Sequence, residues 1–276
     1  MNVSSLLRGC LCLLLIVPAV AFAVGESQAS AETLRVYFGT YTRGGKVFDS
    51  QNVVAWRAAD VRCRRGPRPL VIVGAHYDAV TAGQGADDNA TGIAATLECA
   101  RRLRKHERRH TLRFIGFGAE EQLSVGSSRY VREQAADLDR IAWVCNFDSI
   151  GAHFGLSEVM CTGTPEMEAC VRAVVDTRLQ YGTACADVCP YQDQFWFAAH
   201  GIPGAWFSRR THLPGYWYHH SEHNNLDAVS CEETAWAAET ACAILSELAA
   251  SDTWPFPRAI APAMQTKIEG YLRELF

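Results

Sequence analysis

The sequence has no Cys-x-x-Cys pair, no internal repeat, no low-complexity tract and no strong excess of either charge. The absent cysteine spacing argues against a structural zinc knuckle. The formal net charge of -4 gives no bias towards nucleic acid, which usually binds basic surfaces. The 276 residues are 49% hydrophobic, which is enough to bury the core of one catalytic-sized domain and argues against a disordered chain.

A membrane-spanning run is also missing at the amino terminus. The apolar run from Leu11 to Val24 is shorter than the roughly 20 residues that cross a bilayer. Together with two small-residue sites, it predicts a signal peptide over residues 1–31, cleaved after Ala23 or Ala31, with an uncleaved anchor as the alternative. We expect a secreted or otherwise extracytoplasmic protein without stable membrane insertion after cleavage, folded as a single domain over 32–276.

Cysteine, by contrast, is abundant, with eleven residues in the chain and an odd set of nine beyond the predicted signal peptide. Disulfides are typical of exported proteins. Cys99, Cys145 and Cys161 lie in apolar contexts and are expected to be buried free thiols. Cys185 and Cys189 are predicted to form a disulfide that closes a short surface loop, and any other pairing stays open.

Apolar, β-branched runs alternate with helical patterns along the chain, which predicts a sheet with helices on its faces. The segment 34–48 is expected to form strand and turn. Further strands are predicted at 52–56, 70–75, 112–117, 142–147, 158–161 and 204–207, and helices at 90–105, 127–136, 165–179, 232–249 and 263–275.

Charged residues follow three of the predicted strands at the point where each strand ends. His76 and Asp78 follow an almost wholly apolar strand, the pair at 120–121 follows a second, and Asp148 follows a third. A buried carboxylate without a partner is costly. Ligands of such sheets gather outside the carboxyl ends of the strands, so we expect a binding site at this edge.

Imidazole and carboxylate groups together suit zinc. Asp78, two residues after His76, is placed to accept the other imidazole N–H and fix its tautomer. Of Glu120 and Glu121, one would ligate a metal while the other takes a proton from water. Each motif alone also has an ordinary interpretation, such as a helix N-cap within the segment 87–89 or a solvated pair of glutamates.

The motifs GAHYDAV, GADDN, GFGAEE and NFDSIG occur in this order and are followed by YHHS and NLD. This set resembles the di-zinc exopeptidase family of secreted bacterial aminopeptidases, glutamate carboxypeptidases and glutaminyl cyclases. The resemblance runs from about Asn52 to Leu248. It implies an α/β three-layer sandwich, in which a mixed central β-sheet is flanked by helices on both faces. It also implies peptide substrates, hydrolysis at peptide ends and two zinc ions.

The resemblance implies a role for each position of the motifs. Glu120 would be the general base acting on a water that bridges the zinc ions, and Asp78 would orient a ligating histidine. The implied ligands are His76 and Asp148 for one zinc, Glu121 and His220 for the other, and Asp88 between the two.

Several positions leave alternatives open. His219 and His223 are rivals of His220 as ligand, and Asp87 is expected to be a solvated or loop-capping neighbour of the bridging aspartate. Asn224 stands where the family commonly has aspartate. Asp193 is either near the pocket or a plain surface residue. Relatives usually have a longer segment before the first predicted core strand, so the domain is expected to have a shortened amino-terminal flank, either compact or incomplete.

The family's commonest activity makes an aminopeptidase the expected function. A carboxypeptidase or dipeptidase is an alternative, in which Arg209 or Arg210 would hold the substrate carboxylate, and a glutaminyl cyclase is another. Outside enzymes, the alternative is an inactive peptidase-like binding domain. Aromatic residues at 195–196, 206 and 216–218 are candidates for an apolar pocket wall, and the basic stretch 101–109 is interpreted as a solvated helix end.

Overall fold

The computed structural model describes residues 32–43, 46–57, 69–105, 109–133, 135–178, 182–210 and 219–276. The predicted signal peptide lies outside these residues. Among the described helices, none has the length and apolar character needed to cross a bilayer.

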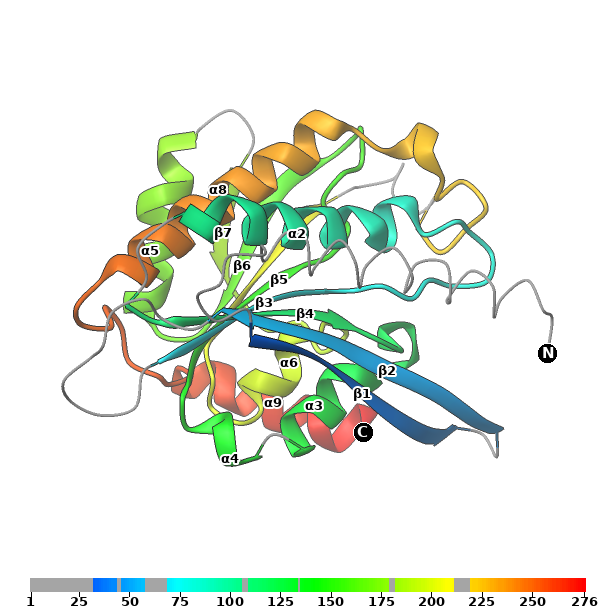
Figure 1. Ribbon diagram of the computed structural model, residues 1–276, viewed down its shortest axis with the longest axis horizontal. Helices are drawn as coiled ribbons and strands as arrows, with labels where there is room; N and C mark the ends of the chain where they lie inside the picture. Colours follow the sequence, from blue (N-terminus) through cyan, green and yellow to red (C-terminus); the bar gives the residue numbers. More distant parts are fainter. Residues whose placement is uncertain are drawn as a thin grey trace.

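A mixed eight-stranded sheet forms the middle of the described structure, in the order β1-β2-β4-β3-β5-β8-β6-β7 (Figure 1). Neighbours among β4, β3, β5 and β8 run parallel, as do β6 and β7, whereas the pairs β1–β2, β2–β4 and β6–β8 are antiparallel. The strands are β1 (Glu32–Arg43), β2 (Lys46–Arg57), β3 (Leu70–His76), β4 (Thr111–Phe117), β5 (Ile141–Phe147), β6 (Leu156–Thr162), β7 (Gly182–Ala186) and β8 (Gly204–Arg210).

Helices cover both faces of this sheet. Figure 1 shows α2, α5 and α8 on one side and α3, α4, α6 and α9 on the other. The predicted three-layer α/β sandwich is therefore confirmed. The helices are α2 (Gly92–Arg102), α3 (Val125–Glu133), α4 (Ala135–Leu138), α5 (Pro165–Val175), α6 (Gln194–Ala198), α8 (Cys231–Ala250) and α9 (Pro262–Leu275).

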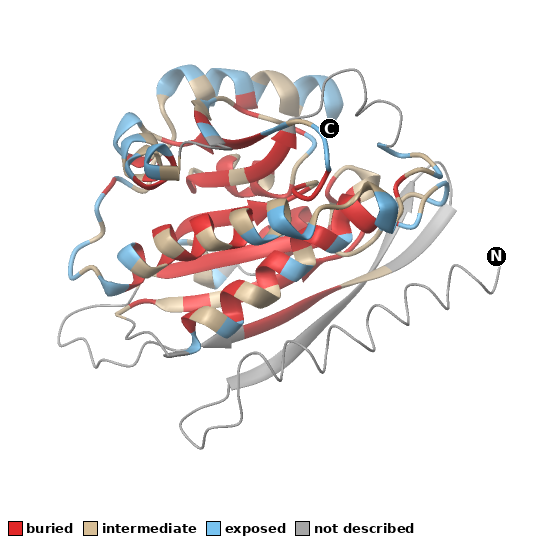
Figure 2. Cartoon of the chain, turned by 90° about the horizontal axis from the view of Figure 1, so that it is seen from above, coloured by how far each residue is buried: buried red, intermediate tan, exposed pale blue. Residues whose placement is uncertain are grey.

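The central strands are buried on both faces, as Figure 2 shows by the colour of the sheet. All seven residues of β3 are buried. Because side chains alternate along a strand, Val71 and Val73 pack into the core under α2 and α8, while Leu70 and Ile72 pack into the core on the opposite face. This two-sided burial explains why the strand is an uninterrupted apolar run.

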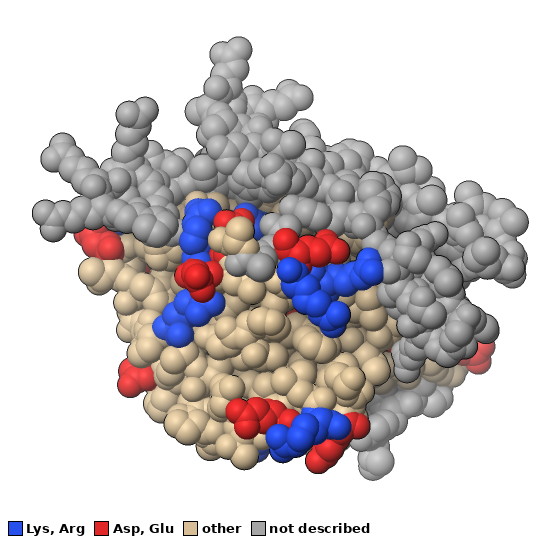
Figure 3. All heavy atoms as spheres, turned by 90° about the horizontal axis from the view of Figure 1, so that it is seen from below, with Lys and Arg blue, Asp and Glu red and all other residues tan. Residues whose placement is uncertain are grey.

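Helix ends follow local sequence signals. Thr164 accepts a hydrogen bond from the backbone N–H of Met167, and Pro165 follows at the first helical position of α5. The described part of the basic stretch behaves as expected, because Arg101 and Arg102 lie in the last turn of α2 and pair with Glu98. On the face shown in Figure 3, acidic and basic side chains of the described residues lie side by side.

Two short elements were missed by the sequence analysis, and one prediction is wrong. The strand β7 and the helix α6 have only five residues each, too few to show a clear period. Cys185 and Cys189 are both free thiols, so the predicted disulfide is absent. Cys185 is held in β7, where its Sγ lies 3.4 Å from Glu158 Oε1. Cys99, Cys145 and Cys161 are buried, as predicted.

Candidate metal centre and pocket

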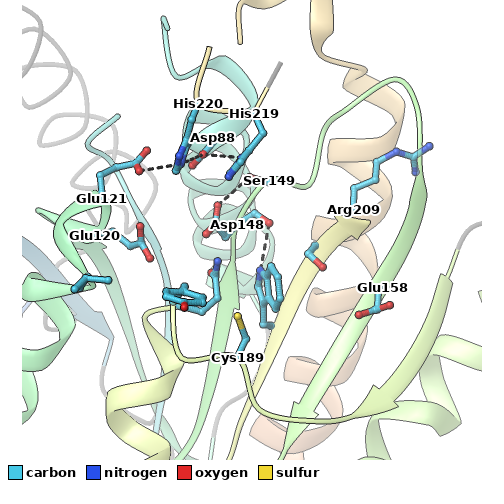
Figure 4. Close-up of a pocket in the computed structure, with 15 residues that line it drawn as sticks. Asp88, Glu120, Glu121, Asp148, Ser149, Glu158, Cys189, Arg209, His219 and His220 are labelled. Carbon is cyan, nitrogen blue, oxygen red and sulfur yellow. Dashed lines mark hydrogen bonds and ion pairs between the residues drawn. The ribbon is translucent and has the colours of Figure 1, made fainter. Parts of the chain in front are cut away.

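Five segments that are distant in sequence bring charged side chains to one edge of the sheet. His76 ends β3, Asp148 follows β5, and Glu120 begins a 3-10 turn after β4. Because β3, β4 and β5 are parallel neighbours, their carboxyl ends meet. Asp88 lies in the turn before α2, and the loop that carries His220 crosses the same edge (Figure 4).

One imidazole–carboxylate group is built on the core, and we call it the inner group. It consists of His76, Asp88 and Asp148, all buried. His76 Nε2 lies 3.1 Å from Asp88 Oδ1 and 3.3 Å from Asp148 Oδ1. The Nδ1 atom of His76 lies 3.0 Å from the carbonyl oxygen of Asp78, which can only accept a hydrogen bond. Nδ1 is therefore protonated and donates to this carbonyl, while Nε2 faces the two carboxylates. Burial opposes ionisation of the ring, but the charge and hydrogen bonding of Asp148 raise the pKa of His76 well above its ordinary value.

A second group, the outer group, consists of Asp88, Glu121 and His220. His220 Nε2 lies 3.3 Å from Asp88 Oδ2 and 3.0 Å from Glu121 Oε2. Hydrogen bonds to Asp88 and Glu121 raise the pKa of His220 to about 10. Burial opposes ionisation of Asp88, but its hydrogen bonds with His220 and His76 hold its pKa below the usual range. The carboxylates of Asp88 and Glu121 therefore favour a positive charge in the outer group.

His219 lies beside the outer group. Its ring stacks on that of His220 with centroids 3.8 Å apart, and its Nδ1 lies 3.4 Å from Asp88 Oδ2. Both rings point towards Asp88 in Figure 4, but the short contact with Glu121 is made by His220. His223 belongs to neither candidate metal group of the described residues.

Among the described residues, two sets of donor atoms lie within 4.8 Å of one another and could hold a metal ion: the inner group, and the set of Asp88, His219 and His220. His220 also contacts Glu121, which is not part of either set. Ligands about 2.0 to 2.2 Å from a tetrahedral zinc lie roughly 3.3 to 3.6 Å apart. The imidazole–carboxylate distances of 3.0 to 3.3 Å are slightly shorter than or equal to the lower value. Asp88 divides its two oxygens between the groups. Every donor is nitrogen or oxygen, so the residues present fit zinc binding.

Asp78 ties the inner group to the neighbouring turn. Its carboxylate oxygens accept hydrogen bonds from the backbone N–H groups of Glu120 and Glu121, at 3.0 and 3.2 Å. The sequence analysis expected this carboxylate to orient His76, whereas the carbonyl oxygen of Asp78 is the nearer acceptor, since Nδ1 is 3.6 Å from Oδ1. Asp78 thus contacts both the histidine and the glutamate turn.

Glu120 is buried beside the two groups. Ser124 Oγ donates a hydrogen bond of 3.1 Å to its Oε1 atom. Burial raises the pKa of Glu120 well above that of an ordinary glutamate, although the charge of His76 opposes the shift. Glu120 is therefore a buried carboxyl group that lines the cavity beside the candidate metal ligands.

The turn that carries Asp88 is fixed by its own backbone and by a neighbouring loop. Gly92 approaches Asn89 and the carbonyl of Phe147 so closely that any added Cβ atom would collide with both. Asn224 Oδ1 accepts from the backbone N–H of Asp87 at 2.8 Å, and Asn224 Nδ2 donates to the carbonyl of Asp88 at 3.3 Å. The amide therefore makes two different hydrogen bonds, one of which an aspartate would be unable to donate.

The structure decides between the alternatives that the sequence leaves open for two aspartates. Asp87 is buried, and its Oδ1 accepts from the backbone N–H of Gly151 at 2.7 Å, so it joins loops and is not solvated. Asp193 has no exposed surface, which excludes the plain surface interpretation. Burial raises the pKa of Asp193 to about 7. The sequence shows neither burial, because both residues lie in irregular or very short elements.

A cavity of about 490 Å³ opens beside both groups. It extends past the charged centre to residues that the sequence analysis did not single out, among them Ser149, Glu158, Cys189 and Ser208. Of the candidate aromatic residues, Trp206 lines this cavity, together with Tyr191. Phe195 and Trp196 instead pack against Phe276 at the carboxyl terminus, and residues 216–218 lie outside the described structure.

Arg209 is the arginine among the described residues that line the cavity. Its Nη1 donates to Glu233 Oε2 at 2.6 Å and to Ser157 Oγ at 2.9 Å. Both partners of this ion pair are buried or nearly so. Arg209 is therefore already bound to an acid of α8, while the side chain of Arg210 lies outside the described structure.

The fold and the centre define a class: an α/β sandwich with an imidazole–carboxylate metal site at the carboxyl ends of its parallel strands. The sequence model of peptidase family M28 matches residues 53–245, and the chain belongs to this family. The match covers every residue of the inner and outer groups.

Relatives with curated descriptions include peptidases acting at either end of a chain. An aminopeptidase of Pseudomonas aeruginosa strain UCBPP-PA14 is 42% identical over 153 residues, covering 48% of this chain and 27% of the relative. Carboxypeptidase Q of Rattus norvegicus is 29% identical over 195 residues, covering 69% of this chain and 39% of the relative. The chain thus spans less than half the length of these relatives.

Among solved structures, an aminopeptidase from Aneurinibacillus sp. strain AM-1 superposes with a TM-score of 0.65 at 29% sequence identity. The superposition covers 79% of this chain and 51% of the other. This similarity agrees with the three-layer sandwich described above.

Proposed function

We propose that this protein is a zinc-dependent aminopeptidase that removes residues from the free amino ends of peptides. The main support for this proposal is that two imidazole–carboxylate groups share Asp88 and lie beside a cavity and the buried Glu120. His76 and Asp148 would hold one zinc ion, Glu121 and His220 a second, and Asp88 both. Bound zinc supplies Lewis acidity, which polarises a carbonyl and makes water more acidic.

The residues of the chain divide the remaining work. Glu120 takes a proton from the attacking water, whose oxygen bonds to the scissile carbonyl carbon, and passes the proton to the amine nitrogen as the C–N bond breaks. Because Ser124 holds Oε1, we assign the transfer to Oε2. The burial of Glu120 beside the candidate metal ligands supports this role, because a general base must lie close to the water that it deprotonates. Asp78 positions Glu120 through its backbone N–H.

The charges of the cavity favour an amino terminus over a carboxyl terminus. A carboxypeptidase needs a cation for the substrate carboxylate, but Arg209 is bound to Glu233. The acidic wall suits an ammonium group. The carboxypeptidase alternative keeps the support of the relative from rat. A cyclase that binds one zinc ion does not require the outer group. An inactive binding domain requires neither the metal ligands nor the general base Glu120.

The function is tested with peptides that carry free or acetylated amino termini, incubated with the zinc-loaded mature protein and analysed by mass spectrometry. Stepwise loss from free amino termini alone, absent in Glu120→Gln, is expected. Loss from carboxyl termini, or cyclisation of amino-terminal glutamine, would redirect the assignment within the family. Metal analysis of the active protein should give close to two zinc ions per chain.

We also place the mature protein outside the cytoplasm, with peptides as partners. The basis is the apolar amino-terminal run followed by small residues. Amino-terminal sequencing of the protein from its exporting host should begin at Val24 or Glu32. An intact Met1 in the exported fraction would support the anchor alternative instead.

A further inference from the structure

Two cysteines meet where the helices α2 and α8 pack against each other on one face of the sheet (Figure 1). Cys99 of α2 and Cys242 of α8 are 143 positions apart in sequence, yet their Sγ atoms lie 3.3 Å apart. The Sγ atom of Cys99 also lies 3.7 Å from the carbonyl oxygen of Ala238, one turn before Cys242. Both cysteines are buried in the core under these helices. The fold therefore makes neighbours of two thiols that are distant in the chain.

The packing of the two helices holds this pair in a fixed register. Arg102 of α2 forms an ion pair of 2.8 Å with Glu239 of α8, so a second contact joins the helices three residues from each cysteine. The buried neighbours Ala95 and Ala241 are small, which lets the helices approach closely. Because a disulfide bond is about 2.05 Å long, the two sulfur atoms need to close by only about 1.3 Å. Rotation about the Cα–Cβ bonds of the two cysteines provides such a movement.

We propose that the exported protein carries a disulfide bond between Cys99 and Cys242, which joins α2 to α8. The inference rests on the proposed location outside the cytoplasm, where disulfides persist, and not on the peptidase activity. The structure shows the reduced pair, with both thiols free.

The oxidant is itself a disulfide, either glutathione disulfide or that of a disulfide-exchange protein. The thiolate of one cysteine attacks it, forms a mixed disulfide and releases the first thiol of the oxidant. The thiolate of the second cysteine then attacks the protein sulfur of the mixed disulfide and releases the other thiol. The two cysteines thus give up two protons and two electrons, which leave with the two thiols of the reduced oxidant.

Other uses of these thiols have less support. A structural zinc site takes four ligands, but the candidate metal groups of the described residues consist of histidines and aspartates without a cysteine. Cys145 of β5 belongs to the same core, but the short contact between sulfur atoms is made by Cys99 and Cys242. Cysteines that act as redox switches are accessible and have a low pKa. Burial instead raises the pKa of Cys99 well above its ordinary value. Exchange therefore precedes the docking of the two helices, and the finished bond is shielded from reductants.

The bond links the two segments that carry the outer group. The helix α2 begins directly after the turn of Asp88, and α8 begins after the loop that carries His220. The cross-link closes a long loop of chain, which strongly restricts the unfolded state. It therefore stabilises the fold around the candidate metal centre.

Peptide mapping detects the bond. The mature protein from the exported fraction is denatured with an alkylating agent but no reductant, digested and analysed by mass spectrometry. We expect two linked peptides that contain Cys99 and Cys242 and are together two hydrogen atoms lighter than the reduced pair. Alkylation of both cysteines without reductant overturns the inference, as does a link between Cys99 and Cys145.

Refolding separates the inference from the proposed location. If the chain is absent from the exported fraction, the location is rejected, and mapping of mature protein refolded in a buffer of glutathione and glutathione disulfide decides the pairing. Linked Cys99 and Cys242 support the inference there, and their alkylation overturns it. Loss of peptidase activity alone changes neither result.

Melting temperatures of the metal-free protein distinguish this bond from any other. Refolding with a phosphine reductant in place of the glutathione buffer should lower the melting temperature of the wild type by about 5 °C or more. Cys242→Ala should remove most of this difference, whereas Cys145→Ala, which alters another buried cysteine of the same core, should keep it. An equal difference in the wild type and in folded Cys242→Ala overturns the inference. Because mapping uses the wild type, it decides the pairing whether or not a variant folds.

Discussion

The inner and outer groups share one aspartate but are held by different parts of the molecule. His76 belongs to a core strand and is 1% exposed, whereas the side chains of His219 and His220 are 52% and 46% exposed on a loop. The sheet thus fixes the geometry of the inner group, while that of the outer group depends on contacts between loops. This difference predicts unequal responses to mutation.

Asp88 connects the inner and outer groups, because one of its oxygens contacts each group. Its removal should therefore affect both groups at once. We expect Asp88→Ala to lose both zinc ions and all measurable peptidase activity. Metal analysis after gel filtration measures the first effect, and mass spectrometry of peptides with free amino termini measures the second. A variant that retained two zinc ions would contradict the shared role of this residue.

Glu120→Gln should separate binding from catalysis. The amide preserves the shape of the side chain but is not a base, so kcat should fall by about 10² to 10⁴-fold. Zinc content and KM should change little. Equal losses of zinc and activity would instead make Glu120 a metal ligand, and Glu133→Gln is the control for a lost surface charge.

Removing each histidine from the metal-free protein should expose the difference in support. His76→Ala leaves two buried carboxylates without their imidazole partner, which should lower the free energy of unfolding by about 1 to 3 kcal/mol. His220→Ala acts on an exposed loop and should cost about 1 kcal/mol or less. Chemical denaturation in a chelator measures both values, and the reverse order would refute the assignment of support.

Asn224→Asp tests how far the loop of the outer group supports Asp88. The carboxylate can still accept from Asp87 but can no longer donate to the carbonyl of Asp88. Zinc affinity, measured by chelator competition, should fall by about 10 to 100-fold, as it does when residues supporting a ligand are changed. Asn225→Asp, a neighbouring helix cap, should change this affinity much less.

The smallest effect is expected far from the centre. Hydrogen bonds from Arg101 and then Arg102 lower the pKa of Glu98 to about 2, against a burial effect that raises it. The unfolded chain therefore binds more protons between pH 2 and 4.5, so this pair stabilises the fold above pH 4.5 and loses its effect as pH falls. In Glu98→Gln, the free energy of unfolding should fall less between pH 4.5 and pH 2 than in the wild type, by a difference of less than about 1 kcal/mol.

Strand ends were the most predictable feature of the site. The apolar run at 70–75 and the acids after it placed His76 and Asp148 at one edge, because parallel strands must end together. Strand and turn were predicted at 34–48 and a separate strand at 52–56, whereas β1 and β2 are two long paired strands that cover both predicted segments. Side-chain direction was less predictable, as the contacts of Asp78 with backbone N–H groups show.

Features that depend on tertiary contacts could not be predicted from the sequence. Cys185 was predicted to close a short loop with Cys189, yet pairing of β7 with β6 places Cys185 in a strand. Glu158 was indistinguishable from any other strand glutamate until β8 placed Ser208 and Trp206 beside it. In both cases the neighbouring strand, which is remote in sequence, decides the environment.

The span of the centre along the chain links zinc binding to folding. Its residues begin at His76 and end at His220, so the set is complete only when three parallel strands and the later loop have docked. Contacts of such long sequence separation form late and slowly. A partly folded chain holds scattered ligands of weak affinity, and tight uptake of zinc therefore marks the end of folding. In an export pathway, this would keep the hydrolytic centre unassembled until the chain has finished folding.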